Sequence, residues 1–321
     1  MTVSGEAYFN LTFIESPEDI LFHVIDDVVY NAQVSIDLNL GSEQPLPVSV
    51  PPNPLNPVAL GKVRAKLADY LSHETTDYRV KADLPRRALL AITSYNEPFY
   101  ANGSKTGLFY TEALHPFEAL VEAGFEVDFA SETGTYGVDE HSLSKDFLSE
   151  DDQKVLDDPE HPFNIKLNSQ LRKASDLNPA DYGLFFASAG HATLWDYPTA
   201  RGLQHIAEDI YKRGGVVSAV CHGPAILPGI IDSTTGKSII AGKKVTGFTT
   251  EGEVMLSLLD IIKSANVATI EEGAAAVGAE YVAPPTPFAD FTQTDGRVVT
   301  GANPASARST AEDAIKVFSS L

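Results

Sequence analysis

The chain has 321 residues, of which 43% are hydrophobic and 21% are charged, so it has ample material for a globular core. Its formal net charge of −21 argues against a nucleic-acid partner or an anionic membrane surface, because both present phosphate. No apolar stretch approaches the roughly 18 residues of a membrane span. The single cysteine cannot form an internal disulfide, and the start lacks the basic region of a signal peptide, so we expect a cytoplasmic protein.

Residues 1–84 are predicted to form an N-terminal extension without a chemical motif. Strand-like runs occur at 8–14 and 22–40. A proline-rich segment at 45–57 favours extended polyproline geometry and disfavours helix and sheet interiors. Apolar residues on one helical face then predict an amphipathic helix over 59–72. We expect this extension to be a docking arm or an oligomer contact.

From residue 85 to 321, strands and helices are predicted to alternate. The expected strands cover 88–93, 125–130, 182–187, 216–220 and 244–246, and the expected helices cover 114–123, 200–213, 253–263 and 305–318. A further helix opens at Pro224, and Asp295-Gly296 predicts a hairpin turn between 291–293 and 297–300. The region from about 132 to 180 is acidic and interrupts the regular alternation of strands and helices. The alternation predicts an α/β sandwich around a mostly parallel sheet.

Cys221 lies at the carboxyl end of the predicted strand at 216–220. Gly223 and Pro224 follow it and mark a tight turn into a helix. Binding sites of parallel sheets lie at this end of the strands. The helix N–H groups and dipole are expected to favour a thiolate. The pattern therefore predicts a reactive cysteine on an elbow rather than a structural one.

Three side chains are candidate partners of a nucleophilic thiol. His222 is adjacent and is either its base or a residue that lines the turn. Glu253 could orient the imidazole, but Thr250 and Glu253 have the spacing of a capping box, and the pattern favours that cap. Glu112 precedes Pro116 at the mouth of a helix, where it either complements the helix dipole or shuttles a proton beside the thiol.

Gly190 follows the strand at 182–187 and lets the backbone approach closely. Its N–H could join that of His222 as an oxyanion hole, although a plain turn explains the pattern equally well. His115 and Glu118 have the spacing of two metal ligands, but no third ligand is evident, so no metal is expected. The glycines form no dinucleotide or phosphate-binding signature, and no cofactor is expected.

Several motifs in order resemble one known group of enzymes. They are TEALHPF (111–117), GFEVDFASETG (124–134), FFASAGH (185–191), AVCHGPA (219–225) and DGRVVTGANPAS (295–306). Over about 86–318 the chain resembles the heat-shock-protein-31-like glyoxalase III group of the DJ-1/PfpI superfamily. The resemblance implies a flavodoxin-like three-layer sandwich. It also implies that Cys221 is the nucleophile, His222 its base, Glu253 the acid of a triad and Glu112 the carboxyl group beside the thiol.

The resemblance further implies a cofactor-free lyase, a glutathione-independent glyoxalase (D-lactate dehydratase) that converts methylglyoxal to D-lactate through a cysteine hemithioacetal. The alternatives are a stress-inducible holdase chaperone, and a protein deglycase or cysteine amidohydrolase on the same fold. The expected partners are a small dicarbonyl substrate, a second copy in a homodimer, and unfolded client proteins. Two departures from the group are Ala192, where glycine is common, and Val138, where an aromatic residue is frequent.

Overall fold

The computed structural model describes residues 35–36, 48–49 and 84–321, and the chain divides into two units, Met1–Val80 and Lys81–Leu321. The strand expected at 8–14, most of the strand expected at 22–40 and the helix expected at 59–72 lie outside the described residues. The boundary expected at 84 stays a prediction.

Within the first unit, two short strands pair. Strand β1 (Ser35–Ile36) is antiparallel to β2 (Val48–Ser49). Strand β2 lies inside the proline-rich segment, where strand pairing was not expected. Neither of the two paired residues, Val48 and Ser49, is a proline, so each keeps its backbone N–H.

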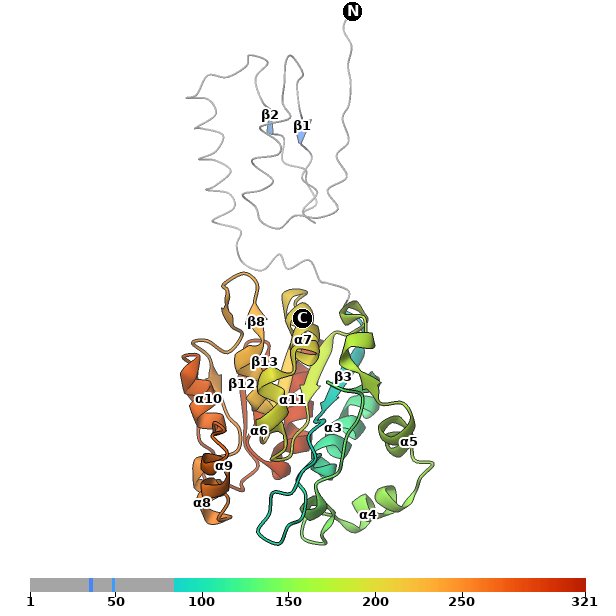
Figure 1. Ribbon diagram of the computed structural model, residues 1–321. Helices are drawn as coiled ribbons and strands as arrows, with labels where there is room; N and C mark the ends of the chain where they lie inside the picture. Colours follow the sequence, from blue (N-terminus) through green and yellow to red (C-terminus); the bar gives the residue numbers. More distant parts are fainter. Residues whose placement is uncertain (1–34, 37–47, 50–83) are drawn as a thin grey trace, which may run out of the picture. The chain divides into compact units, whose positions relative to one another are not determined.

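A sheet forms the centre of the second unit (Figure 1). It has seven strands in the order β12-β13-β7-β6-β3-β4-β5. All neighbours are parallel except β12 and β13. The strands are β3 (Arg87–Ile92), β4 (Glu126–Ser131), β5 (Arg172–Lys173), β6 (Leu184–Ala187), β7 (Val216–Val220), β12 (Thr292–Asp295) and β13 (Val298–Gly301). The hairpin between β12 and β13 turns at Gly296, whose φ of 60° suits glycine, as the Asp295-Gly296 pair predicted.

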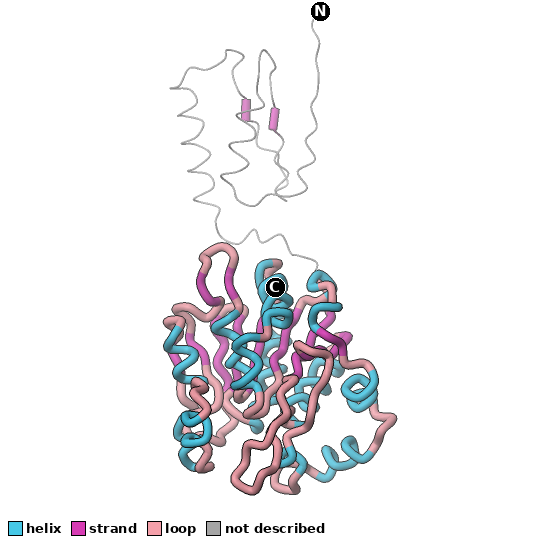
Figure 2. The backbone as a smooth tube through the Cα atoms, in the orientation of Figure 1, coloured by secondary structure: helices cyan, strands magenta, loops and turns pink. Residues whose placement is uncertain are grey.

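Helices cover both faces of this sheet. Helices α3 (Tyr110–Glu122) and α11 (Ala307–Ser319) pack together on one face, and α7 (Arg201–Lys212) covers the other. Alternate residues of β3 divide between the two cores, with Leu90 on the α3 side and Leu89 on the α7 side. Figure 2 shows the helices on either side of the strands. The predicted three-layer sandwich with a mostly parallel sheet is confirmed.

Three predicted helices differ in extent or type. Helix α3 begins at Tyr110, earlier than expected, and contains Pro116. The single helix expected at 253–263 is wrong: α8 (Thr250–Met255) and α9 (Leu259–Ser264) are separate, and Ser257 between them has a φ of 59° that ends a right-handed helix. The helix at Pro224 is a 3-10 helix, η5 (Gly223–Gly229), because Pro228 interrupts regular α-helical bonding.

The acidic region at 132–180 is more ordered than expected. It holds η1 (Glu140–Leu143), α4 (Glu150–Asp157), α5 (Pro162–Ser169), η2 (Ala174–Asp176) and η3 (Pro179–Asp181). A capping box between Ser149 and Asp152 begins α4, and Pro162 opens α5.

The remaining elements are short and lie around the sheet. They are α6 (Thr193–Asp196), η4 (Tyr197–Thr199), β8 (Ile231–Asp232), β9 (Lys237–Ser238), β10 (Lys244–Val245), α10 (Ile270–Ala276), β11 (Glu280–Tyr281) and η6 (Pro304–Ser306). Of these only β10 was predicted, within the strand expected at 244–246. In the described part of the chain, no helix combines the length and apolar character needed to cross a membrane.

Candidate active site

Cys221 sits directly after β7 in a strained backbone conformation. Its φ is 57°, a left-handed value that costs a non-glycine residue about 1–2 kcal/mol. Its N–H donates to the carbonyl of Gly301, and its own carbonyl accepts from the N–H of Phe248. A Cβ on Gly223 would lie 2.6 Å from the carbonyl oxygen of Ala187, so the next turn also needs a glycine. The elbow predicted from the sequence is therefore present and held by two neighbouring segments.

The cysteine begins a chain of three buried side chains. Its Sγ lies 3.2 Å from Nδ1 of His222, and Nε2 of His222 lies 2.6 Å from Oε1 of Glu253. An ionised carboxylate only accepts hydrogen bonds, so Nε2 of His222 carries the hydrogen and Nδ1 faces the thiol as an acceptor. Burial, and then the charge of His191, lower the pKa of His222 to about 4, although Glu253 raises it. His222 is therefore neutral at pH 7 and able to accept a proton.

Glu253 does not cap its helix. The N-cap of α8 is Thr249, whose hydroxyl accepts from the N–H of Gly252 at 2.8 Å. The capping box expected between Thr250 and Glu253 is therefore wrong by one residue, because the helix begins one position earlier than that box requires. The Glu253 carboxylate turns away from the helix terminus and toward His222.

Glu112 lies in the first turn of α3 and is fully buried. Among the described residues, neither of its carboxyl oxygens has a hydrogen-bond partner. Burial raises the pKa of Glu112 to about 8, the Cys221 thiol lowers it in part, and the charge of Asp139 raises it further. Asp139 is itself buried and accepts from the hydroxyl of Thr106. Glu112 can thus exist in either protonation state near neutral pH.

The thiol and Glu112 affect each other's protonation. Burial raises the pKa of the Cys221 thiol well above its ordinary value, and the charge of Glu112 raises it further, whereas the backbone N–H of His222 lowers it. Two adjacent buried anions are unfavourable, so the pair carries at most one negative charge. The helix terminus alone does not ionise the thiol, and that part of the sequence argument is wrong. A thiolate at Cys221 requires Glu112 to keep its proton or His222 to take one.

Gly190 occupies the loop after β6. Its φ is 128°, and a Cβ there would lie 2.0 Å from the carbonyl oxygen of Gly107. Ala192 follows in a right-handed conformation with a φ of −49°, and its N–H donates to Thr106. A methyl group is therefore accommodated at 192. The oxyanion hole at Gly190 and His222 stays a prediction.

His191 is a member of the cluster that sequence reasoning missed. Its Nε2 lies 3.0 Å from Oε2 of Glu253, and its ring centroid is 4.1 Å from that of His222. The available signal was the Ser188-Ala189-Gly190-His191 segment, which drew attention only to its glycine.

The DJ-1/PfpI family model matches residues 106–316, which contain Glu112, Gly190, Cys221, His222 and Glu253. The chain belongs to the DJ-1/PfpI family. Glyoxalase 3 of Candida albicans is 54% identical over 232 residues, covering 72% of this chain and 98% of that protein. Glutathione-independent glyoxalase HSP31 of Saccharomyces cerevisiae is 54% identical over 227 residues, covering 71% and 95%.

Solved structures agree with this assignment. The crystal structure of glyoxalase III from Candida albicans matches with a TM-score of 0.71 and 54% identity, over 72% of this chain and 97% of that one. The predicted resemblance to the glyoxalase III group of the DJ-1/PfpI family is therefore confirmed. The matched portion spans nearly the whole length of these relatives.

One group of side chains in the described part of this DJ-1/PfpI chain has the spacing of metal ligands. His191, His222 and Glu253 each offer a ligand atom, and these atoms lie within 4.8 Å of one another. Hydrogen bonds already engage Nε2 of both histidines and both carboxylate oxygens of Glu253. The pair considered from the sequence does not gather ligands: Nε2 of His115 pairs with Asp152, 2.9 Å away.

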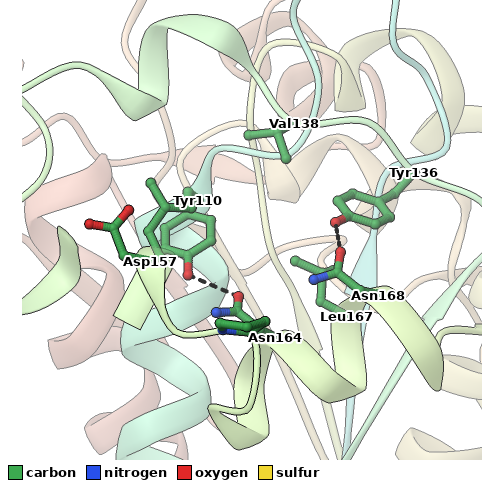
Figure 3. Close-up of a pocket in the computed structure, with 9 residues that line it drawn as sticks. Tyr110, Tyr136, Val138, Asp157, Asn164, Leu167 and Asn168 are labelled. Atoms are coloured by element: carbon green, nitrogen blue, oxygen red, sulfur yellow. Dashed lines mark hydrogen bonds between the residues drawn. The ribbon is translucent and has the colours of Figure 1, made fainter. Parts of the chain in front are cut away.

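A cavity of about 280 Å³ lies elsewhere in the DJ-1/PfpI fold (Figure 3). Its lining includes Tyr110, Tyr136, Val138, Asn164 and Asn168, and none of the predicted catalytic residues. The hydroxyls of Tyr110 and Tyr136 donate to Asn164 and Asn168, respectively. Both tyrosine hydroxyls of the wall are therefore hydrogen-bonded, and Val138 lines this cavity.

Proposed function

We propose that this protein is a glutathione-independent glyoxalase that converts methylglyoxal to D-lactate. The observation that carries the proposal is the single cysteine on a strained elbow, 3.2 Å from a histidine that is bonded to a buried glutamate. A carboxyl group with a pKa near 8 adjoins the same thiol. Relatives with 54% identity carry the name of this activity, which supports the assignment.

The first step is attack by sulfur on the aldehyde carbon, C1. Nδ1 of His222 accepts the thiol proton, and Glu253 stabilises the resulting imidazolium. The sulfur then forms a bond to C1, and the aldehyde oxygen becomes the oxyanion of a hemithioacetal. We assign the N–H groups of Gly190 and His222 to that oxygen. Transfer of the Glu112 proton to that oxygen completes the hemithioacetal and leaves Glu112 as a carboxylate.

The second step moves a proton from C1 to C2. Either His222 or Glu112 can act as the base, and the structure favours Glu112. Its oxygens meet no other donor in the described part, and a pKa of about 8 lets it both accept and return a proton near pH 7. Removal of the C1 proton gives an enediolate. Return of that proton to C2, with transfer of the proton on the C1 oxygen to the C2 oxygen, gives a lactoyl thioester. Attack of water on the thioester breaks the C–S bond and releases lactate and the thiol.

The direct test follows the loss of methylglyoxal and the formation of D-lactate with no glutathione added. We expect Cys221→Ala to have no measurable activity, because it lacks the nucleophile, and to keep the wild-type circular dichroism spectrum. Glu112→Gln should lose about 10²–10⁴-fold in kcat while Cys221 remains reactive toward iodoacetamide. Full activity in Cys221→Ala would eliminate the mechanism.

A holdase chaperone activity is a second proposal, which exposed apolar side chains support. Val254, Met255 and Leu256 lie together at the end of α8, and they are 58%, 60% and 45% exposed. Such a patch can bind unfolded clients or a second copy in a homodimer. If it binds clients, Cys221→Ala should still suppress aggregation of a denatured protein, and Met255→Asp should not. Light scattering by the wild type at several concentrations would measure its molar mass and so report a homodimer. Separately, we propose a cytoplasmic location, which microscopy of a tagged chain would test.

A further inference from the structure

The carboxylate of Glu253 is bound by two histidines from different strand ends. His222 follows β7 and lies 2.6 Å from Oε1, whereas His191 follows β6 and lies 3.0 Å from Oε2. Both contacts are made by Nε2, and each histidine presents its Nε2–H to the ionised carboxylate. Both oxygens of Glu253 are therefore engaged, one by the proposed base and one by a residue with no role in the steps above.

Packing fixes the orientation of the His191 imidazole. Its ring centroid lies 4.1 Å from that of His222 and 5.0 Å from that of Phe99. The side chain is only 10% exposed. A ring enclosed in this way cannot swing aside without opening a void in a closely packed region. His191 thus offers Glu253 a donor at a fixed place.

We infer that His191 is a positioning residue. By holding Oε2 it keeps the Glu253 carboxylate turned so that Oε1 meets Nε2 of His222 and Nδ1 of His222 faces Cys221. The inference rests on the proposed function, because it assigns His191 to the orientation of the proposed base. His191 acts through Glu253 and not on the thiol itself.

Charge supports the same arrangement. Burial by itself raises the pKa of Glu253, but His191 and then His222 lower it well below its ordinary range. The carboxylate is therefore ionised, as the tautomer of His222 requires. In the described part of the chain, the titratable groups beside this cluster include Cys221, Glu112 and Tyr100, and the Tyr100 ring lies edge-on to that of His191.

The test compares two substitutions with a matched control. His191→Gln keeps a nitrogen donor at about the reach of Nε2, and His191→Leu removes it. His115→Leu is the control, because it breaks another histidine–carboxylate pair, His115 with Asp152, at a site without an assigned role. Two quantities are measured for each full-length variant: kcat and KM for methylglyoxal without glutathione, and the pH dependence of iodoacetamide alkylation. Alkylation reports on Cys221 alone, because the chain has one cysteine.

We expect His191→Leu to lower kcat about 10- to 100-fold with little change in KM, since a small misplacement of a catalytic group has effects of this size. It should also slow alkylation at neutral pH. His191→Gln should stay within about threefold of wild type, and His115→Leu should keep the wild-type kcat. The inference is overturned if His191→Leu matches wild type in both assays, or if His191→Gln is as impaired as His191→Leu. A wild type that makes no lactate would end the proposed function, and the alkylation profiles would still decide the role of His191.

Discussion

Glu112 and Cys221 are two buried groups whose charged forms are both unfavourable where they lie. Burial raises the pKa of each, and each negative charge opposes the other. The pair therefore keeps one proton across a wide pH range, and that proton is available to a reaction that needs both an acid and a base. A fully solvated carboxyl group would be ionised near pH 7 and could not donate a proton.

This burial predicts a pH-dependent loss of stability. The pKa of Glu112 is about 8 in the folded chain and 4.5 in its unperturbed state, so between these values the folded state binds the extra proton. The contribution of Glu112 to the free energy of unfolding is therefore fully present below pH 4.5. It is lost as pH rises through about 8, and the loss between these values is about 1.4 kcal/mol per pH unit. Glu112→Gln lacks this titration. Its stability relative to wild type should increase by up to about 4 kcal/mol from pH 5 to pH 8.

Urea unfolding of both proteins at several pH values measures this difference. Comparison of the two cancels the titration of the other groups, and the Cys221 thiol keeps its proton over this range because burial raises its pKa well above its ordinary value. A difference that stays constant over this range would contradict the raised pKa of Glu112.

At the scale of the elements, the site is formed by segments that follow three strands of the seven-stranded sheet, together with Glu253 of α8. The loop after β6 carries Gly190 and His191, the elbow after β7 carries Cys221 and His222, and Glu112 lies in the helix after β3. Parallel strands bring their carboxyl ends to one edge of the sheet, so residues far apart in sequence meet there. The loop after β6 packs tightly against the segment that contains Gly107, because Gly190 lies against the backbone of that residue.

Gly190→Ala should therefore impair both stability and activity. Its Cβ would lie 2.0 Å from the Gly107 carbonyl oxygen, so the loop that carries His191 has to move. Gly214→Ala is the matched control: Gly214 also has a positive φ, 93°, but a Cβ there meets no atom within 4 Å. The control should lose about 1–2 kcal/mol from backbone strain alone and keep its kcat. Thermal unfolding and kcat measured on both variants test this, and equal losses in the two would argue against a crowded loop.

At the scale of the whole molecule, the family model matches residues 106–316, which lie within the second unit. Glyoxalase 3 of Candida albicans matches 72% of this chain yet 98% of its own length, so that relative has almost nothing left to match the remaining residues. All of the predicted catalytic residues lie in the matched family region at 106–316.

Removal of residues 1–80 should therefore leave kcat/KM for methylglyoxal within about threefold of the full chain, because no proposed catalytic group is lost. The assay is D-lactate formation by the two proteins at equal concentration. Size-exclusion chromatography of both would show in addition whether these residues contribute to an oligomer. A truncated protein that is folded by circular dichroism but inactive would place an essential group in the first 80 residues.

The sequence by itself determined the central strands of the sheet, the elbow and the identity of the chemical groups. The apolar run at 216–220 is β7 as predicted, and Gly223 and Pro224 marked the turn that holds Cys221. These features depend on local periodicity and turn chemistry, which neighbouring residues carry. Only the tertiary structure decided that Glu253 meets two histidines rather than capping its helix, and that burial opposes ionisation of the thiol. Those outcomes depend on strand register and on the exclusion of water by segments that are distant in the sequence. A pattern of neighbouring residues indicates neither.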